Sequence, residues 1–517
     1  MTFEIVFVLL SLLGMVAVLI ADKMRPGMIL FSVVVLFLCA GILTPKEMLE
    51  GFSNKGMITV ALLFLVSEGI RQSGTLGQVI KKLLPQGKTT VFKAQLRILP
   101  SVAFISAFLN NTPVVVIFAP IIKHWAKSVN LPATKFLIPL SYVTILGGIC
   151  TLIGTSTNLV VHGMILEAGF EGFSMFELGK VGIFIAIAGI IYIFLFSKRL
   201  LPDARPDTAV PDEEVEEGEK LHRVEAVLGA RFPGINKKLK DFNFQRHYGA
   251  EVKEIKTRNG QRFVSNLEEV VLHEGDTLVV MADDTFIPTW GESSVFVLLT
   301  NGNEPDTTGK KKRWFALLLL VLMIVGATVG ELPVTKEMFP DIKLDMFFFV
   351  SITTIIMAWT NLFPARKYTK YISWDILITI ACAFAISKAM VNSGVADSVA
   401  KFIIGLSDDY GPHVLLAMVF IITNLFTELI TNNAAAALAF PLALSISAQL
   451  GVSPTPFFVV ICMAASASFS TPIGYQTNLI VQGIGGYKFT DFVKIGLPLN
   501  LITFLISVFV IPMIWKF

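Results

Sequence analysis

Long apolar runs separated by short polar segments make up most of this chain. Ten of these runs are long enough to cross the hydrocarbon core of a bilayer as helices, a thickness of about 30 Å. They fall into two groups, residues 3–21, 28–43, 57–70, 136–166 and 180–200, and residues 314–330, 346–362, 373–390, 456–482 and 495–515. The pattern predicts a polytopic α-helical membrane protein with five spans in each half.

Adjacent polar residues interrupt one further apolar segment in each half. Segment 98–123 contains Asn110-Asn111-Thr112, and segment 412–447 contains Thr431-Asn432-Asn433. Non-helical backbone within a bilayer is tolerated only where protein or a polar cavity surrounds it. Each segment is therefore expected to be a re-entrant hairpin rather than a straight span. Second polar breaks, expected to divide a later helix of each half, follow around residues 154–158 and 472–478.

The two halves match when the chain is shifted by 320 residues. The shift places Gly154, Thr157 and Asn158 on Gly474, Thr477 and Asn478, and Ser73-Gly74 on Ser393-Gly394. Because two distant segments agree on one register, we expect an internal repeat. Five spans is an odd number, so the second half would be inverted relative to the first. Repeats with interrupted hydrophobic segments at matching positions are typical of secondary transporters with a site near the bilayer midplane.

The segment between the halves has a different composition. Residues 201–220 contain prolines and a dense acidic run, which is typical of a linker, and residues 301–313 form a second charged linker. Residues 221–300 alternate short apolar stretches with turn residues, including a hairpin turn at Asn259-Gly260. We expect a small cytosolic α+β domain here. The transmembrane repeats on either side of it would be residues 1–200 and 314–517.

Composition and charge narrow the class of protein. Hydrophobic residues make up 54% and charged residues 16% of the chain, compared with roughly 45–50% and 25% in soluble domains. The net charge of +3 is too small to indicate a nucleic-acid partner. No nucleophile–base set or phosphate loop indicates an enzyme, and no cofactor is expected. The four cysteines all lie in apolar runs without metal-ligand spacing.

Basic residues in short loops collect on one side of this ten-span topology. Arg71, Lys123 and Arg366 are examples, whereas the loops 167–180 and 392–412 on the other side are neutral or acidic. Cytoplasmic loops of membrane proteins carry an excess of lysine and arginine. We therefore expect a multi-pass cell-membrane protein with both termini extracytoplasmic and the central domain cytoplasmic.

The polar breaks supply binding groups of two opposite kinds. Hydroxyl, amide and freed carbonyl oxygens at broken helix ends suit sodium, a hard cation. Amide and hydroxyl donors, with the backbone N–H groups at half-helix N-termini, suit a small anion. The structural alternative is that asparagine and threonine merely hold neighbouring membrane helices together. Four breaks in repeated order favour a binding site over this alternative.

Two parts of the chain resemble known families. Leu239-Lys240-Asp241, residues 246–252 and residues 272–280 resemble the TrkA-C domain of potassium-uptake regulators. The membrane halves resemble the divalent-anion/sodium symporter (DASS) family, which carries a Ser-Asn-Thr triplet at each hairpin tip. Asn110-Asn111-Thr112 and Thr431-Asn432-Asn433 stand at the triplet positions, with one flanking residue changed in each. Together the two resemblances cover nearly the whole chain.

The DASS resemblance implies sodium-coupled symport of a small divalent anion by alternating access. Sulfate is favoured over a C4-dicarboxylate or citrate, because a TrkA-C insertion is most similar to the sulfate-type permeases. The implied sodium ligands are Ser106, Asn110, Asn111 and Gly154 in one site, and Thr427, the carbonyl of Ile430, Asn432 and Gly474 in the other. The implied substrate contacts are Asn111, Thr112, Thr155, Thr431, Asn432, Asn433 and Tyr475.

Some roles and functions stay open. Asn158 and Asn478 are expected to support the site, and Glu428 is expected to be either a structural carboxylate or a ligand of a coupling ion. A TrkA-C-gated channel is an alternative function, although Ile473-Gly474-Tyr475-Gln476 lacks the second glycine of a potassium filter. A proton-coupled antiporter using Glu428 is another. The expected partners are the anion, sodium, membrane lipid and a second copy of the chain in a homodimer.

Overall fold

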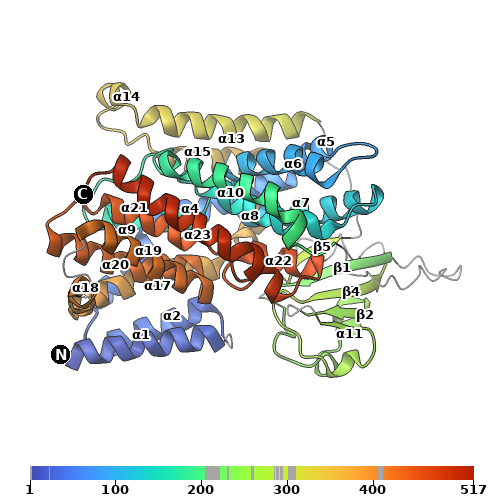
Figure 1. Cartoon of the computed structure of the whole chain (residues 1–517), viewed down its shortest axis with the longest axis horizontal. Helices are drawn as coiled ribbons and strands as arrows, with labels where there is room; N and C mark the ends of the chain where they lie inside the picture. The colour runs from blue at the N-terminus through green and yellow to red at the C-terminus, as the bar shows by residue number, and fades with distance from the viewer. Residues whose placement is uncertain are drawn as a thin grey trace, which may run out of the picture.

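The structure is a computed structural model that describes residues 3–21, 24–203, 222–229, 232–257, 261–283, 295–300, 310–405 and 411–517, with Phe286 and Trp290. In this part of the chain, long helices form a bundle and a small β-sheet lies at one end of it (Figure 1). Both chain termini lie at the end of the bundle away from the sheet (Figure 1). Most of the two expected linkers, residues 201–220 and 301–313, and the expected turn at Asn259-Gly260 lie outside the described residues.

The described helices fall on either side of the sheet segment in the chain. Those before it are α1 Phe3–Ala21, α2 Pro26–Cys39, α3 Pro45–Glu50, α4 Lys55–Gln72, α5 Thr75–Leu83, α6 Val91–Ser106, α7 Asn111–Ser128, α8 Leu137–Gly148, α9 Ser156–Glu167 and α10 Gly179–Leu200. Those after it are α13 Lys310–Gly330, α14 Pro333–Met338, α15 Met346–Trp359, α16 Tyr368–Tyr371, α17 Trp374–Asn392, α18 Val395–Gly405, α19 Gly411–Leu429, α20 Asn432–Leu450, α21 Thr455–Ser466, α22 Gln476–Gly485 and α23 Phe489–Ile514.

Eight helical segments in the described part are long and apolar enough to cross a membrane, and six of them coincide with expected spans. The other two, Gly411–Leu429 and Asn432–Leu450, are the arms of the segment expected to be a re-entrant hairpin. The eight are Phe3–Ala21, Pro45–Gln72, Gly179–Leu200, Lys311–Gly330, Trp374–Asn392, Gly411–Leu429, Asn432–Leu450 and Phe489–Ile514. The expected spans 136–166 and 456–482 do not qualify, because polar breaks divide them into α8 and α9 and into α21 and α22. Two others, α2 and α15, are shorter apolar helices.

Helices of one half pack against helices of the other. In the second half, α22 packs on α7 and α8 of the first half, and α9 of the first half packs on α20 and α21. Matching glycines make matching turns: Gly74 between α4 and α5 and Gly394 between α17 and α18 have φ values of 70° and 74°. This left-handed conformation favours glycine, which lacks a Cβ. The close packing brings the polar breaks of both halves together.

The β-sheet segment has five antiparallel strands in the order β3-β2-β4-β1-β5. Their bounds are β1 His222–Leu228, β2 Glu251–Lys256, β3 Arg262–Phe263, β4 Thr277–Ala282 and β5 Phe296–Thr300, and the short helix α11 spans Phe244–Tyr248. The sheet segment has an aromatic core separate from the core of the helix bundle. It includes Phe232, Phe242, Tyr248 and Phe296.

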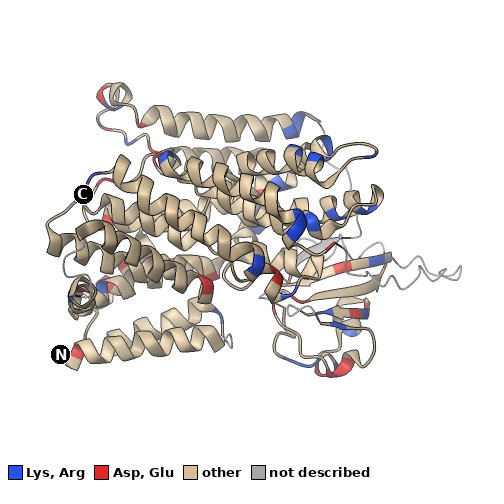
Figure 2. Cartoon of the chain, in the orientation of Figure 1, with Lys and Arg blue, Asp and Glu red and all other residues tan. Residues whose placement is uncertain are grey.

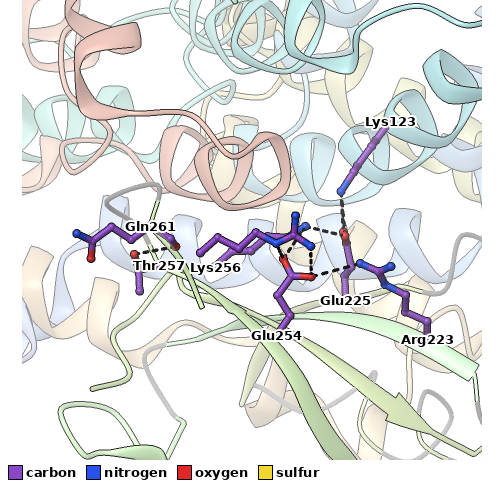
Figure 3. Close-up of polar contacts among 8 residues, drawn as sticks. Lys123, Arg223, Glu225, Glu254, Lys256, Thr257 and Gln261 are labelled. Atoms are coloured by element: carbon purple, nitrogen blue, oxygen red, sulfur yellow. Dashed lines mark hydrogen bonds and ion pairs between the residues drawn. The ribbon is translucent and has the colours of Figure 1, made fainter. Parts of the chain in front are cut away.

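The sheet touches the helices through charged and apolar contacts. Lys123 on α7 lies 2.9 and 3.0 Å from the two carboxylate oxygens of Glu225 on β1 (Figure 3). Val227 on β1 belongs to the same apolar core as the helix bundle. On α22, a Cβ added to Gly483 would lie 2.7 Å from the Thr277 hydroxyl oxygen and 3.0 Å from the Gly275 carbonyl oxygen. The sheet therefore contacts one helix from each half, α7 and α22.

Candidate functional site

Each hairpin tip is closed by the same side-chain hydrogen bond. In the first, α6 ends at Ser106 and α7 begins at Asn111, and the Ser106 hydroxyl donates to Asn111 Oδ1 over 2.6 Å. In the second, the Thr427 hydroxyl donates to Asn432 Oδ1 over 2.8 Å. The donor and acceptor are five residues apart in both tips. The structure therefore brings together two expected sodium ligands in each half.

The remaining tip residues take more local roles. The hydroxyl of Thr431 accepts a hydrogen bond from the Ala434 N–H and so caps α20. Asn110 is the residue before α7, and its side chain makes no capping bond. The Ile430 N–H donates to the Phe426 carbonyl over 2.8 Å, and this residue is buried.

The second break of each half is held by an asparagine. Asn158 Nδ2 donates to the carbonyls of Gly148 and Thr151, at 3.4 and 2.9 Å. Asn478 Nδ2 donates to the carbonyls of Ser468 and Thr471, at 2.9 and 3.1 Å. Each asparagine thus satisfies carbonyl groups that the interrupted helix leaves without N–H partners.

Threonines tie the second break of each half to its hairpin tip. The hydroxyl of Thr151 donates to the carbonyl of Ala107, and the hydroxyl of Thr471 donates to the carbonyl of Glu428 over 3.1 Å. In both halves the same threonine also accepts the N–H of the glycine three residues later, Gly154 or Gly474. Tip and break therefore form one unit in each half.

Oxygen atoms crowd around these two glycines. A Cβ on Gly154 would lie 2.5 Å from the Gly148 carbonyl oxygen and 3.0 Å from that of Ala107. A Cβ on Gly474 would lie 2.0 Å from the Ser468 hydroxyl and 2.5 Å from the Thr427 carbonyl oxygen. Within the described residues, no group of three or more histidine, cysteine or acidic side chains could hold a metal. Neutral hard oxygens suit an alkali cation better than a transition metal.

Expected substrate residues from the two halves bond to one another. The Tyr475 hydroxyl accepts from Asn111 Nδ2 over 2.6 Å and lies 3.3 Å from the Thr155 hydroxyl. Asn433 Oδ1 accepts from the hydroxyls of Ser156 and Thr157, at 3.3 and 3.1 Å. All four polar breaks therefore meet at one place between the halves. The Thr431 hydroxyl, by contrast, bonds the Ala434 N–H of its own half.

Several residues at this place were not among the expected site residues. Gln476 accepts from the Thr112 hydroxyl over 3.4 Å, and Ser141 on α8 donates to Thr477 and Asn478 over 2.8 and 2.7 Å. Gln476 stands inside the second break, so its position in the sequence could have identified it. Ser141 lies in a largely apolar run beside Tyr142 and Thr144, and only the packing of α8 against α22 reveals its role.

The side chains at the meeting point differ in their exposure. Asn111 and Thr155 are each 3% exposed, and the hydrogen bonds among the breaks join groups that a ligand would otherwise contact. Two cavities of the described part lie elsewhere: one of about 340 Å³ beside Arg25 and Asp375, and one of about 530 Å³ beside Gln261 and His273 on the sheet domain. Thr112 and Tyr475 are half-buried and Gln476 is exposed, so the meeting point has a buried part and an accessible edge.

The contact between sheet and helices has a strong electrostatic component. Burial by itself would raise the pKa of Glu225, but the ammonium groups of Lys123 and Lys256 outweigh it and lower the pKa to about 2. Lys256 on β2 lies 3.4 Å from Glu225 (Figure 3). Arg262 on β3 pairs with Glu254 on the neighbouring strand β2. Because Lys123 is on the helix that begins at Asn111, this ion pair connects the sheet to a hairpin tip.

Comparison with known proteins places these features in a family. The chain matches the citrate transporter family CitMHS over residues 16–449 and again over residues 342–517. It is 29% identical to an uncharacterized transporter of Synechocystis, across 93% of this chain and 92% of that protein. It is 22% identical to sodium/sulfate cotransporter 1 of Chlamydomonas reinhardtii, across 96% of this chain and 88% of the relative.

A shorter match joins the chain to dicarboxylate transport. It is 26% identical to the sodium-dependent dicarboxylate transporter SdcS of Staphylococcus saprophyticus, across 28% of each protein. These matches and the apolar helices identify a multi-pass membrane transporter rather than an enzyme. The protein belongs to the CitMHS citrate transporter family, which is related to sodium/sulfate and dicarboxylate transporters.

Proposed function

We propose that the protein is a sodium-coupled symporter of a small divalent anion that works by alternating access. The observation that carries the proposal is the meeting of the four polar breaks. Asn111 and Thr155 from one half contact Tyr475 from the other, at a buried point between helices. A ligand that replaces these bonds would contact both halves at once, so its binding would depend on how the halves are arranged.

Sodium would occupy two places, one in each half. The first has Ser106, Asn110, Asn111 and Gly154, and the second has Thr427, the Ile430 carbonyl, Asn432 and Gly474. The oxygens crowded around Gly154 and Gly474 support this assignment, because only glycine leaves space between them. The similarity to a sodium/sulfate cotransporter and a sodium-dependent dicarboxylate transporter also supports sodium as the coupling ion.

The anion would lie between the sodium sites. Its donors would be the side chains of Asn111, Thr112, Thr155, Thr431, Asn432, Asn433 and Tyr475, together with N–H groups at the starts of α7, α9, α20 and α22. The breaks carry no lysine or arginine, so bound sodium would supply the positive charge. Sulfate is favoured over a C4-dicarboxylate or citrate, because the sodium/sulfate relative matches along nearly the whole chain and the dicarboxylate relative along 28%.

Alternating access would follow from two inverted repeats that move relative to each other. The matching bonds of the two hairpin tips, Ser106 to Asn111 and Thr427 to Asn432, support the repeat. Figure 2 shows many lysines and arginines near the end of the bundle that carries the sheet, which supports a cytoplasmic position for the sheet domain. The domain itself would be of the TrkA-C kind. Extracytoplasmic termini and a homodimer complete the proposed arrangement.

Counterflow in liposomes tests the proposal. Purified protein is loaded with unlabelled sulfate, succinate or citrate, and entry of the labelled anion is measured with sodium, potassium or a proton gradient as the driving ion. We expect sulfate exchange that requires sodium. Exchange driven by protons alone would contradict sodium coupling, and a steady ionic current that does not saturate with the anion would favour a channel.

A further inference from the structure

The carboxylate of Glu428 lies inside the helix bundle near the end of α19. Its Oε1 accepts hydrogen bonds from the Ser470 N–H over 2.8 Å and from Asn500 Nδ2 over 2.7 Å. N–H donors complement the negative charge of a carboxylate. The backbone and the side chain of Thr471 also interact with this carboxylate. Its Oε2 is buried and makes no hydrogen bond of normal geometry among the described residues.

A second bare oxygen belongs to Asn500 on α23. Asn500 is 7% exposed, and its Oδ1 is also buried without a partner in the described part of the chain. Its Nδ2 donates one hydrogen bond to Glu428 Oε1 and another to the Ser470 hydroxyl, the latter over 2.8 Å. Three side chains from α19, α23 and the break before α22 thus meet with two unused oxygens. Buried polar groups in proteins are otherwise nearly always satisfied.

The chemistry of this cluster suits a monovalent cation. A buried charge is normally paired or bound to a metal ion. Glu428 forms no ion pair with a lysine, arginine or histidine of the described residues. Carboxylate, amide and hydroxyl oxygens are hard ligands, and one carboxylate balances one positive charge. The backbone carbonyl of the preceding residue, Thr427, faces Gly474, so this cluster adjoins the second proposed sodium site.

Among the described residues, the first half has no equivalent cluster. Thr151 bonds the carbonyl of Ala107 as Thr471 bonds that of Glu428, so alanine takes the place of the carboxylate. The shift of 320 residues places Cys150 on Ser470. Gly182 on α10 packs against Ile149 and Cys150 as Gly496 on α23 packs against Phe469 and Ser470, so Ala186 takes the place of Asn500. A cation bound by this cluster would therefore be additional to a symmetric pair.

We propose that Glu428, Asn500 and Ser470 bind a third sodium ion. This inference rests on the proposed function, because it takes sodium as the coupling ion. Two sodium ions and one divalent anion carry no net charge across the membrane, whereas three sodium ions and the same anion carry one positive charge. The cluster would make transport respond to the membrane potential.

The test measures how many sodium ions accompany each anion. In proteoliposomes with defined sodium and anion gradients, the voltage at which net flux stops gives the coupling ratio. We expect three sodium ions per anion for the unaltered chain and two for Glu428→Gln, together with one fewer radioactive sodium ion bound per protein in detergent. Asn500→Leu provides a second variant, with the same loss expected, should Glu428→Gln not fold.

Glu68→Gln is the matched control, because Glu68 is a buried carboxylate of α4 that already pairs with Arg71 at 2.6 Å. It should keep the coupling ratio and the number of bound sodium ions. An unchanged ratio of sodium to anion in Glu428→Gln would refute the third site while leaving sodium symport intact. If Glu428→Gln carried one fewer proton per anion instead of one fewer sodium ion, the third sodium site would also be refuted. Transport by the unaltered chain without any need for sodium would refute the proposed function itself.

Discussion

Asn111 joins the two kinds of binding proposed here within one side chain. Its Oδ1 faces the Ser106 hydroxyl at the hairpin tip, and its Nδ2 faces the Tyr475 hydroxyl of the other half. An amide can present an oxygen to a cation and an N–H to an anion at the same time. The tyrosine, by contrast, faces only the proposed anion position. Substitutions of the two residues should therefore affect transport in different ways.

We expect Asn111→Ala to abolish sodium-driven uptake. Tyr475→Phe should weaken only the binding of the anion. One hydrogen bond contributes about 0.5–1.5 kcal/mol, so Tyr475→Phe should raise the KM for the anion roughly 2- to 10-fold. Its sodium-to-anion ratio should not change. Initial uptake rates at varied sodium and anion concentrations separate the two effects. Sodium-driven uptake that survives in Asn111→Ala would remove this residue from the sodium site.

Much of the site could be predicted from the sequence. Asn110-Asn111 and Asn432-Asn433 stand out because adjacent amides are rare within apolar runs, and the breaks around Gly154 and Gly474 repeat at one spacing. The roles of Ser141 and Asn500 could not be predicted. Each lies in a largely apolar run without a second polar residue of its own kind, and its partners lie more than 25 residues away in the chain.

At the scale of elements, the broken helices need backbone atoms of neighbouring segments to come into close contact. Gly154 stands where the carbonyls of Gly148 and Ala107 converge, and the first of these carbonyl oxygens would lie 2.5 Å from an added Cβ. Backbone atoms cannot move aside as a flexible side chain can. The eight candidate spans also reflect this construction, because breaks shorten the helices that carry them. Hydropathy alone does not distinguish such a broken helix from a straight span.

We expect Gly154→Ala to weaken sodium binding at least about 10-fold, because its methyl group would occupy the space between the oxygens. The measurement is the sodium concentration that half-activates uptake. Gly14→Ala provides the control, since no atom lies within 4 Å of a Cβ at this position on α1. Equal sodium dependence in the two variants would contradict a cation at Gly154.

At the scale of the whole molecule, the sheet domain is attached to both moving parts of the proposed mechanism. It contacts α7 through Lys123 and α22 through Gly483, and these helices begin at Asn111 and Gln476. The pKa of Glu225, about 2, is below its usual value. Its ion pair with Lys123 therefore stabilises the fold above the ordinary glutamate pKa and is lost only as the pH falls toward 2. This contact should not make transport vary between about pH 5 and 8.

We expect a cysteine pair, Thr277→Cys with Gly483→Cys, to slow transport at least about 10-fold once oxidised. The disulfide would fix the sheet to α22, and a reducing agent should restore the rate. The pair is placed in a chain whose four native cysteines have been replaced, and each single cysteine variant is the control. A fully oxidised pair with an unchanged transport rate would indicate that the sheet follows α22 passively.

The hydrogen bond between Asn111 and Tyr475 also has a consequence for synthesis at the ribosome. Its two residues are 364 positions apart in the chain. At about 5–20 residues per second, roughly 20–70 s separate their emergence. The first hairpin is therefore made well before the tyrosine that completes its hydrogen bonds. During this interval its amides need water or the insertion machinery as temporary partners, so the first half cannot reach its final packing until the second half has been translated.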